Sequence, residues 1–485
     1  MLTAVPGRRR VLQLLGVCSL FLLIYSSVRA YRLSFVFDEA SYPMISGEHP
    51  EWKQSASNHP LNTRLMSWMN RVAGPEEWAL RFPNVVAHAL YLGFGLLLLR
   101  RLTDSWMIAL GFVVLNLNPF MLDFFSLARG YGLALGLSMV ALYFLKNALW
   151  PTPSPRAEIF LTLSLVCASL ADLSNFYWLN FHLAMLVAGG LVLYNRFCRS
   201  ELSSSKRVTL TAAILLPLGT AWFFINLIPR VLKLSAIGEF YFGGKDGFVS
   251  DTIVSLVYTY FYGKGGSPAL HSTIAMVGAA AVIAIGSTLA VTEWKRREFS
   301  FAVCLLTILA LSIAAPVCEH ALLGTLYPLE RVALGYVPLA GLLVVFSVER
   351  ILPKGLRERR IASVAVRTGS AMLILVMVVH FATTANLNHT FTWQYDSETK
   401  MAVREIPNHF DVSSGHVVRI DSHWSYQPSI NYYRTRLNFK WLQPVPEGSD
   451  VFYGAPQQIT ERGISHYTIL HRYTATGNLL VRVEK

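Results

Sequence analysis

Long runs of apolar residues alternate with short polar stretches over most of the chain. A bilayer core about 30 Å thick is crossed by roughly 20 residues of helix, so each long apolar run predicts a membrane span. Eleven such runs cover residues 11–28, 82–99, 105–122, 124–145, 158–174, 176–194, 208–229, 270–292, 300–317, 332–348 and 361–383. Residues 1–383 are therefore predicted to form one transmembrane domain.

The final segment, residues 384–485, follows a different pattern. Apolar and polar residues alternate in runs such as His416–Ile420, which predicts β-strands, and Thr476-Gly477 is typical of a turn between two such runs. None of the five cysteines falls in this segment. We therefore predict a small α/β domain that no disulfide stabilises.

Composition supports the membrane interpretation. Hydrophobic residues make up 53% of the 485 residues and charged residues 15%, whereas about 25% of a soluble protein is charged. These values exclude a soluble cytosolic enzyme, a disordered chain and a disulfide scaffold. The predicted fold class is a polytopic α-helical membrane protein, with about 11 transmembrane helices and a small C-terminal extracytoplasmic α/β domain.

Basic residues are distributed unevenly between the two sets of loops. If the N-terminus is cytosolic, the loops on that side hold 19 Lys or Arg in 59 residues. The opposite loops, 29–81, 230–270 and 318–331, hold 11 in 108. The positive-inside rule then places the N-terminus in the cytosol and, after an odd number of spans, the C-terminal domain outside. The net charge of +13 thus reflects topology, and no nucleic-acid partner is expected.

The first span resembles a signal peptide in having a basic start and a short apolar core. Arg29 stands where cleavage would be expected, so we predict an uncleaved anchor. In a bacterium, the protein would be a multi-pass protein of the plasma (inner) membrane.

The ionisable residues gather at the predicted outer ends of the spans, whereas transporters place such residues near the midplane. This distribution favours a membrane enzyme.

Asp38 and Glu39 follow the first span, and consecutive side chains point in different directions, so only one of the two is expected to face a cavity. That carboxylate could act as a general base or a metal ligand. A solvated acidic pair in a loop is the alternative.

Pro60 is well placed to open an amphipathic helix in the outer interface, with His59 at its mouth. His59 could orient a substrate, and a capping or packing role is the alternative.

Three arginines break the positive-inside pattern, namely Arg81, Arg129 and Arg331. Arg129 is expected about one and a half turns inside the outer end of its span, where a charge is costly unless it is paired. Its expected partner is either a lipid phosphate or a carboxylate, Glu330 or Asp123.

The loop 230–270 is rich in aromatic residues and contains two glycine pairs, Gly243-Gly244 and Gly265-Gly266. Such a segment is typical of an interfacial lid or of a stretch that faces lipid. An aromatic belt without a catalytic role is the alternative.

Four motifs occur in the order that is found in a known group of enzymes. The motifs are Phe37-Asp38-Glu39-Ala40-Ser41-Tyr42, His59-Pro60-Leu61, Leu80-Arg81-Phe82-Pro83, and Asn118-Pro119 followed by Ala128-Arg129-Gly130-Tyr131. With these motifs the chain resembles the GT-C glycosyltransferases, and among them the protein O-mannosyltransferase and lipid A aminoarabinose transferase group. Two positions depart from the family pattern, which often has Arg where this chain has Ser41 and a second proline where it has Leu61.

The resemblance implies that a sugar is moved, with inversion, from a polyprenyl-phosphate carrier to an acceptor hydroxyl on the outer face of the membrane. It identifies Asp38, with Glu39 beside it, as the family's first-loop acid. In an inverting displacement Asp38 would be the base, while arginines stabilise the departing phosphate. The residues expected to contact substrate are Tyr42, His59, Arg81, Arg129, Tyr131, Glu330 and Arg331.

The expected partners are the polyprenyl-phosphate-linked sugar donor, a lipid, glycan or protein acceptor, and membrane lipids. No cofactor follows from the motifs, and a divalent metal remains an open alternative, because Asp38 and Glu39 would need distant ligands such as Asp123 or Glu319. Two other functions compete with transfer. One is a transporter or flippase of a lipid-linked substrate, and the other is a membrane-anchored binding protein whose external domain does the work.

Overall fold

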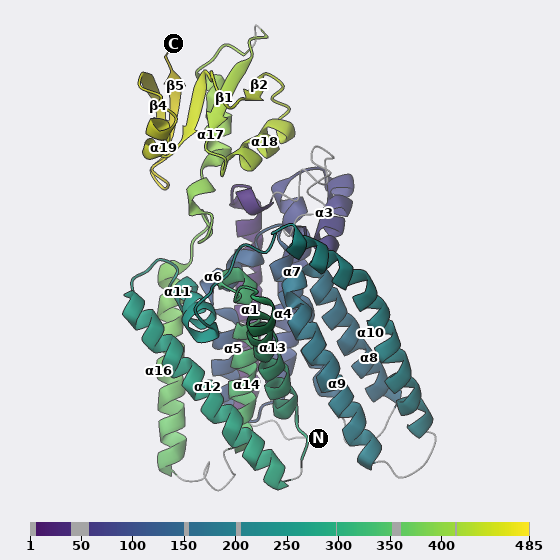
Figure 1. Ribbon diagram of the computed structural model, residues 1–485. Helices are drawn as coiled ribbons and strands as arrows, with labels where there is room; N and C mark the ends of the chain where they lie inside the picture. The colour runs from purple at the N-terminus through teal and green to yellow at the C-terminus, as the bar shows by residue number, and fades with distance from the viewer. Residues whose placement is uncertain are drawn as a thin grey trace.

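The computed structural model describes residues 6–39, 58–149, 155–199, 205–296, 298–351, 360–412 and 415–484. Ser41 and Tyr42 lie outside these residues. A bundle of long helices carries a small α/β domain at one end (Figure 1). We call this end of the bundle the domain end, and the opposite end, near which the N-terminus lies, the far end.

The bundle is built from helices of very different length. Those of the first half are α1 (Pro6–Arg32), η1 (Phe37–Glu39), α3 (Pro60–Ala73), α4 (Glu77–Leu99), α5 (Ser105–Asn116), α6 (Pro119–Phe124), α7 (Gly130–Ala148), α8 (Pro155–Ser174), η3 (Phe176–Trp178), α9 (Leu179–Arg199) and α10 (Ser205–Ala236). They are followed by η4 (Phe248–Ile253), α11 (Val254–Phe261), α12 (Pro268–Arg296), α13 (Phe301–Leu323), η5 (Glu330–Ala333), α14 (Tyr336–Ile351) and α16 (Arg360–Thr384).

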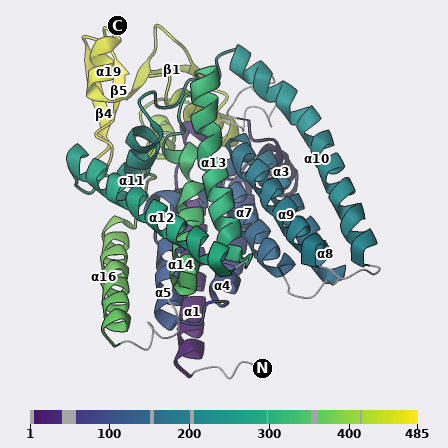
Figure 2. The same ribbon diagram turned by 60° about the horizontal axis from the view of Figure 1, so that its bottom comes forward.

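Nine helical segments of the described chain are long and apolar enough to cross a membrane. They lie in α1, α4, α7, α8, α9, α12, α13, α14 and α16. This confirms the polytopic helical class, with two differences from the eleven predicted spans. The predicted span 105–122 is broken into α5 and α6, and 208–229 lies within the 32-residue α10, which is not among the nine. In both views α10 and α16 stand at opposite edges of the bundle (Figure 2).

The break between α5 and α6 has a local cause. Pro119 occupies the first turn of α6, where it needs no N–H partner, and it could not continue α5. The side chain of Asn118 caps α6 by accepting a hydrogen bond from the Met121 N–H at 3.1 Å. The chain then turns, and α7 starts only at Gly130. The predicted span 124–145 therefore begins six residues late.

The C-terminal domain contains a five-stranded sheet with the order β2-β1-β3-β5-β4. Strand β1 is parallel to both of its neighbours, β2 and β3, and β5 is antiparallel to both β3 and β4. Its elements are η6 (Gln394–Asp396), α17 (Thr399–Glu405), η7 (Ile406–Asn408), β1 (Val418–Ser422), α18 (Gln427–Arg436), β2 (Leu442–Pro444), β3 (Val451–Gly454), α19 (Pro456–Glu461), β4 (Tyr467–Arg472) and β5 (Leu479–Val483). The predicted α/β class of this domain is thus confirmed.

The domain is packed firmly onto the bundle through α18. The rings of Phe35 and Tyr432 stack with centroids 3.9 Å apart, and the N–H of Phe35 donates to the Tyr433 hydroxyl at 2.6 Å. Arg436 of the same helix forms an ion pair with Glu77 at 2.6 Å. One hydrophobic cluster contains residues of both parts of the chain. This contact fixes residues 33–39, the segment that follows α1 and carries Asp38.

Candidate functional site

Asp38 lies between two arginines that come from distant parts of the chain. Its Oδ2 is 3.5 Å from Nη2 of Arg129 and 3.7 Å from Nη2 of Arg331. The Asp38 side chain is 12% exposed, and the two arginine side chains are 3% and 18% exposed. These distances exceed the 2.7–2.9 Å or so of a tight charge-assisted hydrogen bond. The two guanidinium groups therefore face the carboxylate without being fully engaged by it.

Arg129 lies outside the helix that was expected to contain it. It is the N-cap of α7, with extended backbone angles, so it stands before the first turn and not one and a half turns inside a span. The following Gly130 is required by close packing, because a Cβ atom there would lie 1.9 Å from the Ser174 carbonyl oxygen. Close contact of α7 with the end of α8 thus places Arg129 at the domain end, opposite Asp38.

Arg331 is held by aromatic rings and by a strained neighbour. Its guanidinium lies 4.4 Å from the ring centroid of Phe242 and 5.8 Å from that of Trp393, within the range of cation–π attraction. Glu330 has a φ of 47°, a left-handed conformation that is unfavourable for a residue with a side chain. Its N–H donates to the Ser255 hydroxyl at 2.9 Å, which helps to hold this turn.

Glu39, unlike Asp38, is completely buried and fully hydrogen bonded. It forms a two-pronged contact with Arg81, at 2.8 Å to Nε and 2.5 Å to Nη2. The N–H groups of Ala128 and Val36 donate to it at 2.6 and 3.0 Å. Arg81 also donates to three backbone carbonyl oxygens, that of Ala30 in the last turn of α1 and those of Leu33 and Ser34 just after it. The two neighbouring carboxylates therefore have different surroundings, as the divergence of consecutive side chains predicts.

His59 and Tyr131 form an aromatic layer behind Arg129. Both side chains are buried, and their rings meet edge to face with centroids 5.4 Å apart. The Arg129 guanidinium lies 5.9 Å from the Tyr131 ring centroid. Tyr131 is thus the member of this layer whose ring lies beside the Arg129 guanidinium.

Three aromatic residues that were not predicted from the sequence also interact with the charged cluster of Asp38, Arg129 and Arg331. Trp393 contacts Arg331, while Tyr177 interacts electrostatically with both arginines and Tyr395 with Asp38 and Arg331. Burial, reinforced by the charges of Asp396 and Asp38, raises the pKa of Tyr395 above its ordinary value. The density of aromatic residues between 391 and 395, directly after the last span, was the available signal.

A second buried ion pair beneath the cluster joins α1 to α6. Nη2 of Arg29 is 2.6 Å from Oδ1 of Asp123, and both side chains are 1% exposed. The Tyr262 hydroxyl and the Phe391 N–H also donate to this carboxylate, at 2.9 and 2.8 Å. Asp123 is thus the partner of Arg29, and the carboxylate that faces Arg129 is Asp38. Neither of the two carboxylates considered for Arg129, Glu330 or Asp123, takes that place.

The donor set for a divalent metal is not assembled in the part of the chain that the structure describes, where no three His, Cys, Asp or Glu residues lie close enough to hold one. Asp123 and Glu39, which were considered as ligands, are each engaged by an arginine. The side chain of Glu319 hydrogen bonds to Asn180. Asp38 is therefore not joined by further metal ligands within the described ranges.

No family model and no curated protein sequence matches the chain. Its fold does match solved structures. ArnT from Cupriavidus metallidurans in the apo state matches with a TM-score of 0.55 at 12% identity, over 96% of this chain and 97% of that one. The same protein bound to undecaprenyl phosphate matches with a TM-score of 0.53 at 12% identity, over 99% and 98%.

A more distant match is the oligosaccharyltransferase of Archaeoglobus fulgidus, with a TM-score of 0.42 at 13% identity, over 87% of this chain and 62% of that one. The similarity to ArnT, a lipid A aminoarabinose transferase, extends over both the helical bundle and the C-terminal domain. The fold predicted from the sequence is confirmed, since the chain has the fold of the GT-C membrane glycosyltransferases.

Proposed function

We propose that this protein is an inverting glycosyltransferase that moves a sugar from a polyprenyl-phosphate carrier to an acceptor hydroxyl. The observation that carries the proposal is the position of Asp38 between Arg129 and Arg331. A site that combines one accessible carboxylate with two guanidinium groups suits a reaction in which a proton is removed and a phosphate leaves. The solved structure of ArnT with undecaprenyl phosphate supports a carrier of this class.

In the proposed step the acceptor oxygen attacks the anomeric carbon as the bond between that carbon and the phosphate oxygen breaks. Asp38 takes the proton of the attacking hydroxyl, which can contribute about 10²–10⁴ in rate. The departing polyprenyl phosphate keeps the bonding electron pair and gains one negative charge. Arg129 and Arg331 stabilise that charge, and no acid is required because a phosphate is already a weak base.

The loose contacts of Asp38 are consistent with this division of roles. When the carrier's phosphate enters, the two guanidinium groups can bind it in place of Asp38, because their geometry matches phosphate oxygens. The carboxylate oxygens then become available for the acceptor hydroxyl. Asp38 is thus proposed as the catalytic base, with Arg129 and Arg331 as the groups that bind the donor.

The other predicted site residues are assigned to support. Glu39 and Arg81 are buried and mutually paired, so we assign them to holding the Asp38 segment in place. Tyr131 contacts Arg129 and is assigned to orienting it, with His59 packed behind. Glu330 is assigned to setting the turn that presents Arg331.

The proposed orientation follows from charge. The positive-inside rule puts the far end in the cytosol and the domain end, with Asp38, on the outer side. The enzyme would therefore take polyprenyl-linked sugars from the outer side of the membrane, the side on which the C-terminal domain also lies. The acceptor is then a lipid, glycan or protein of the envelope, and the experiment below distinguishes these three classes.

The test compares cells that lack the protein with cells that produce it or its Asp38→Asn variant, with lipid-linked sugars and envelope glycans measured by mass spectrometry. We expect one polyprenyl-phosphate sugar to accumulate without the protein and one envelope component to lose the same sugar. The wild-type chain restores both, and the variant restores neither. A different outcome would support a transporter of the lipid-linked sugar. In that case the lipid-linked sugar accumulates in cells without the protein, but the purified protein in detergent transfers no more sugar than its Asp38→Asn variant.

A further inference from the structure

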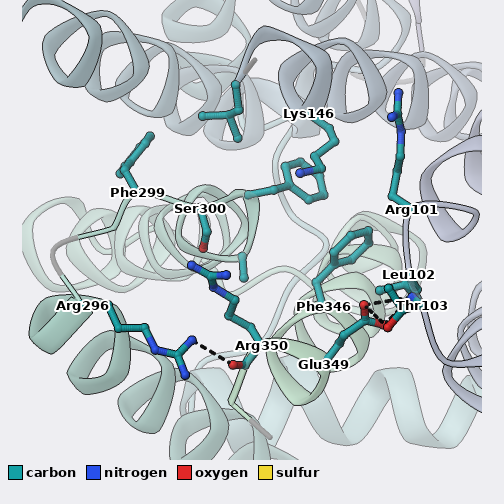
Figure 3. Close-up of a pocket in the computed structure, with 13 residues that line it drawn as sticks. Arg101, Leu102, Thr103, Lys146, Arg296, Phe299, Ser300, Phe346, Glu349 and Arg350 are labelled. Atoms are coloured by element: carbon teal, nitrogen blue, oxygen red, sulfur yellow. Dashed lines mark hydrogen bonds between the residues drawn. The ribbon is translucent and has the colours of Figure 1, made fainter. Parts of the chain in front are cut away.

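A cavity of about 730 Å³ opens at the far end of the bundle, where several helices start or stop (Figure 3). We call it the basic cavity. It lies among the ends of α4, α7, α12 and α14 and the start of α13. Its lining residues are Arg101, Leu102, Thr103, Lys146, Leu149, Arg296, Phe299, Ser300, Phe301, Ala302, Phe346, Glu349 and Arg350.

The basic cavity is separate from the Asp38 cluster. Arg129 precedes α7 and Lys146 lies in its last turn, so the 19-residue helix stands between the two sites, a length of about 28 Å at 1.5 Å per residue. Arg331 and Arg350 are likewise at opposite ends of the segment that contains α14. Its walls are helix ends, and the predicted topology puts these ends at one surface of the membrane, where lipid headgroups are expected.

The charge of the basic cavity is only partly compensated. Arg350 is paired with Glu293 at 2.5 Å and with Glu298. Glu349 accepts two hydrogen bonds from the Thr103 N–H, at 2.9 and 3.0 Å.

The other three cations make no ion pair within the described residues. Arg101 donates to the Asn147 amide oxygen at 2.8 Å, and Arg296 donates to the Arg350 carbonyl oxygen at 3.3 Å. The Lys146 ammonium lies 5.7 Å from the Phe301 ring centroid and is repelled by the charges of Arg101 and Arg350. Like charges held together in a half-buried cavity favour the binding of an anion.

The start of α13 adds hydrogen-bond donors to the same cavity. Ser300 is the N-cap of this 23-residue helix, but its side chain makes no capping hydrogen bond. Its hydroxyl is buried and has no hydrogen-bond partner among the described residues. Figure 3 shows the Arg350 side chain extending toward Ser300. The free N–H groups of a helix's first turn attract negative charge. The helix dipole of α13 and the basic side chains of the cavity therefore both favour an anion.

From this convergence we propose that the basic cavity binds the phosphate group of an anionic phospholipid from the adjoining leaflet. Arg101, Lys146 and Arg296 would bind the phosphate oxygens, and Ser300 would donate a hydrogen bond. The apolar side chains of the lining, such as Phe299, suit the glycerol and upper acyl carbons. A zwitterionic lipid carries the same phosphate, but its ammonium group would be repelled by these cations. Basic pockets between helix ends are a recurrent form of lipid headgroup site.

The proposal is tested with the full-length protein in a neutral detergent. Short-chain phosphatidylglycerol, phosphatidylcholine of the same chain length, and inorganic phosphate are titrated separately, and the thermal unfolding midpoint is followed. Native mass spectrometry counts the lipid molecules retained. We expect saturable binding of phosphatidylglycerol at least tenfold tighter than that of phosphatidylcholine. Equal binding of the two lipids would overturn the proposal, and inorganic phosphate binding as tightly as phosphatidylglycerol would overturn the lipid as the source of the phosphate.

Variants locate the binding. Lys146→Gln and Arg101→Gln should each weaken phosphatidylglycerol binding about tenfold or more, since each removes a charge-assisted contact. Lys295→Gln is the matched control, because Lys295 is exposed at the same end of α12 and does not line the cavity. Equal losses in Lys146→Gln and Lys295→Gln would mean non-specific attraction and overturn the site. Lys146→Arg keeps the charge and should keep binding, which separates charge loss from misfolding.

Discussion

The backbone N–H of Phe37 donates a 2.8 Å hydrogen bond to Oδ2 of Asp396. This contact joins the segment that carries Asp38 to the start of the C-terminal domain. The Asp396 carboxyl also accepts hydrogen bonds from the Ser429 hydroxyl at 2.5 Å and from the Thr399 hydroxyl, and its side chain is completely buried. The C-terminal domain therefore takes part in placing the proposed base.

We predict that Asp396→Ala lowers turnover more than Asp396→Asn. Alanine leaves the half-buried Phe37 N–H without its acceptor, at a cost of up to about 1–3 kcal/mol, and the neighbouring Asp38 would shift. The amide oxygen of asparagine can still accept that hydrogen bond. We expect the alanine variant to lose at least tenfold in kcat with a smaller change in the donor KM, and the asparagine variant to stay within about threefold. Equal activity of the two variants would remove Asp396 from this positioning role.

Stability should depend on pH through the same carboxyl. Burial, aided by the charge of Glu39, raises the pKa of Asp396 from its ordinary 3.8 to about 8, although its three hydrogen bonds act in the opposite direction. Between these values the folded protein holds a proton that the unfolded chain has lost. The contribution of this group to stability is therefore complete below about pH 4, declines as the pH rises, and is lost above about pH 8.

Thermal unfolding of the wild type and of Asp396→Asn between pH 5 and 9 checks this prediction. A single titrating group changes the free energy of unfolding by at most about 1.4 kcal/mol per pH unit. The midpoint of the wild type should fall faster from pH 5 to pH 8 than that of the variant, and the two slopes should become parallel above that. Parallel slopes throughout would show that Asp396 is already ionised in the folded protein at pH 5.

Asp38→Asn should abolish sugar transfer without harming the fold. Asparagine has the same shape and cannot take the acceptor's proton, so kcat should fall by about 10²–10⁴. The apparent donor KM should not rise, because Arg129 and Arg331 lose a competing anion. Insertion and the thermal midpoint should stay near those of the wild type, since the contacts of Asp38 are 3.5 and 3.7 Å long. Turnover of a tenth or more of the wild-type value would exclude Asp38 as the base.

Glu39→Gln should instead act on stability. The change leaves the Arg81 guanidinium buried without its counter-charge, and breaking such a pair costs about 3–5 kcal/mol. We expect a marked drop in the thermal midpoint and loss of folded protein. Glu405→Gln is the control, because Glu405 makes a half-exposed contact with His409, in which the two side chains are 33% and 26% exposed. This variant should have little effect on stability. A fully stable Glu39→Gln that has lost activity would assign Glu39 to catalysis.

The sequence was sufficient to predict the membrane class and the α/β nature of the C-terminal domain. Local patterns carry that information, because apolar length and strand alternation depend on neighbours in sequence. The structure also brings Asp38, Arg129 and Arg331 together, while their roles in the reaction stay predictions. The partner of Arg29 was not predicted, because Asp123 is 94 residues away and only the packing of α6 against α1 brings the two together. A charged residue close to an apolar span needs a partner, and this was the one available hint.

The sequence predicted that Asp38 and Glu39 have different surroundings, but it did not predict which of the two faces the cavity. Either residue could have faced the cavity on spacing alone. The choice is made by the Ala128 N–H and by Arg81, which together engage both oxygens of Glu39. These donors come from the turn before α7 and from α4, so only the tertiary structure decides which carboxylate remains accessible. Trp393 and Tyr395 were missed for the same reason, because they reach the cluster from beyond the last span.

Arg331→Lys provides a test of donor binding. A lysine keeps the positive charge but loses the planar guanidinium that lies over Phe242 and offers paired donors to phosphate. We expect the donor KM to rise about tenfold, equivalent to about 1.4 kcal/mol, with a further loss in kcat because the leaving phosphate is less well stabilised. Lys400→Gln, which removes an ion pair with Glu77 at the domain interface, is the control for a general loss of charge and should leave the donor KM unchanged. Both constants, kcat and the donor KM, are measured from initial rates with a purified polyprenyl-phosphate sugar. Wild-type values in Arg331→Lys would make Arg331 a structural residue. Arg129 would then be the arginine that binds the phosphate.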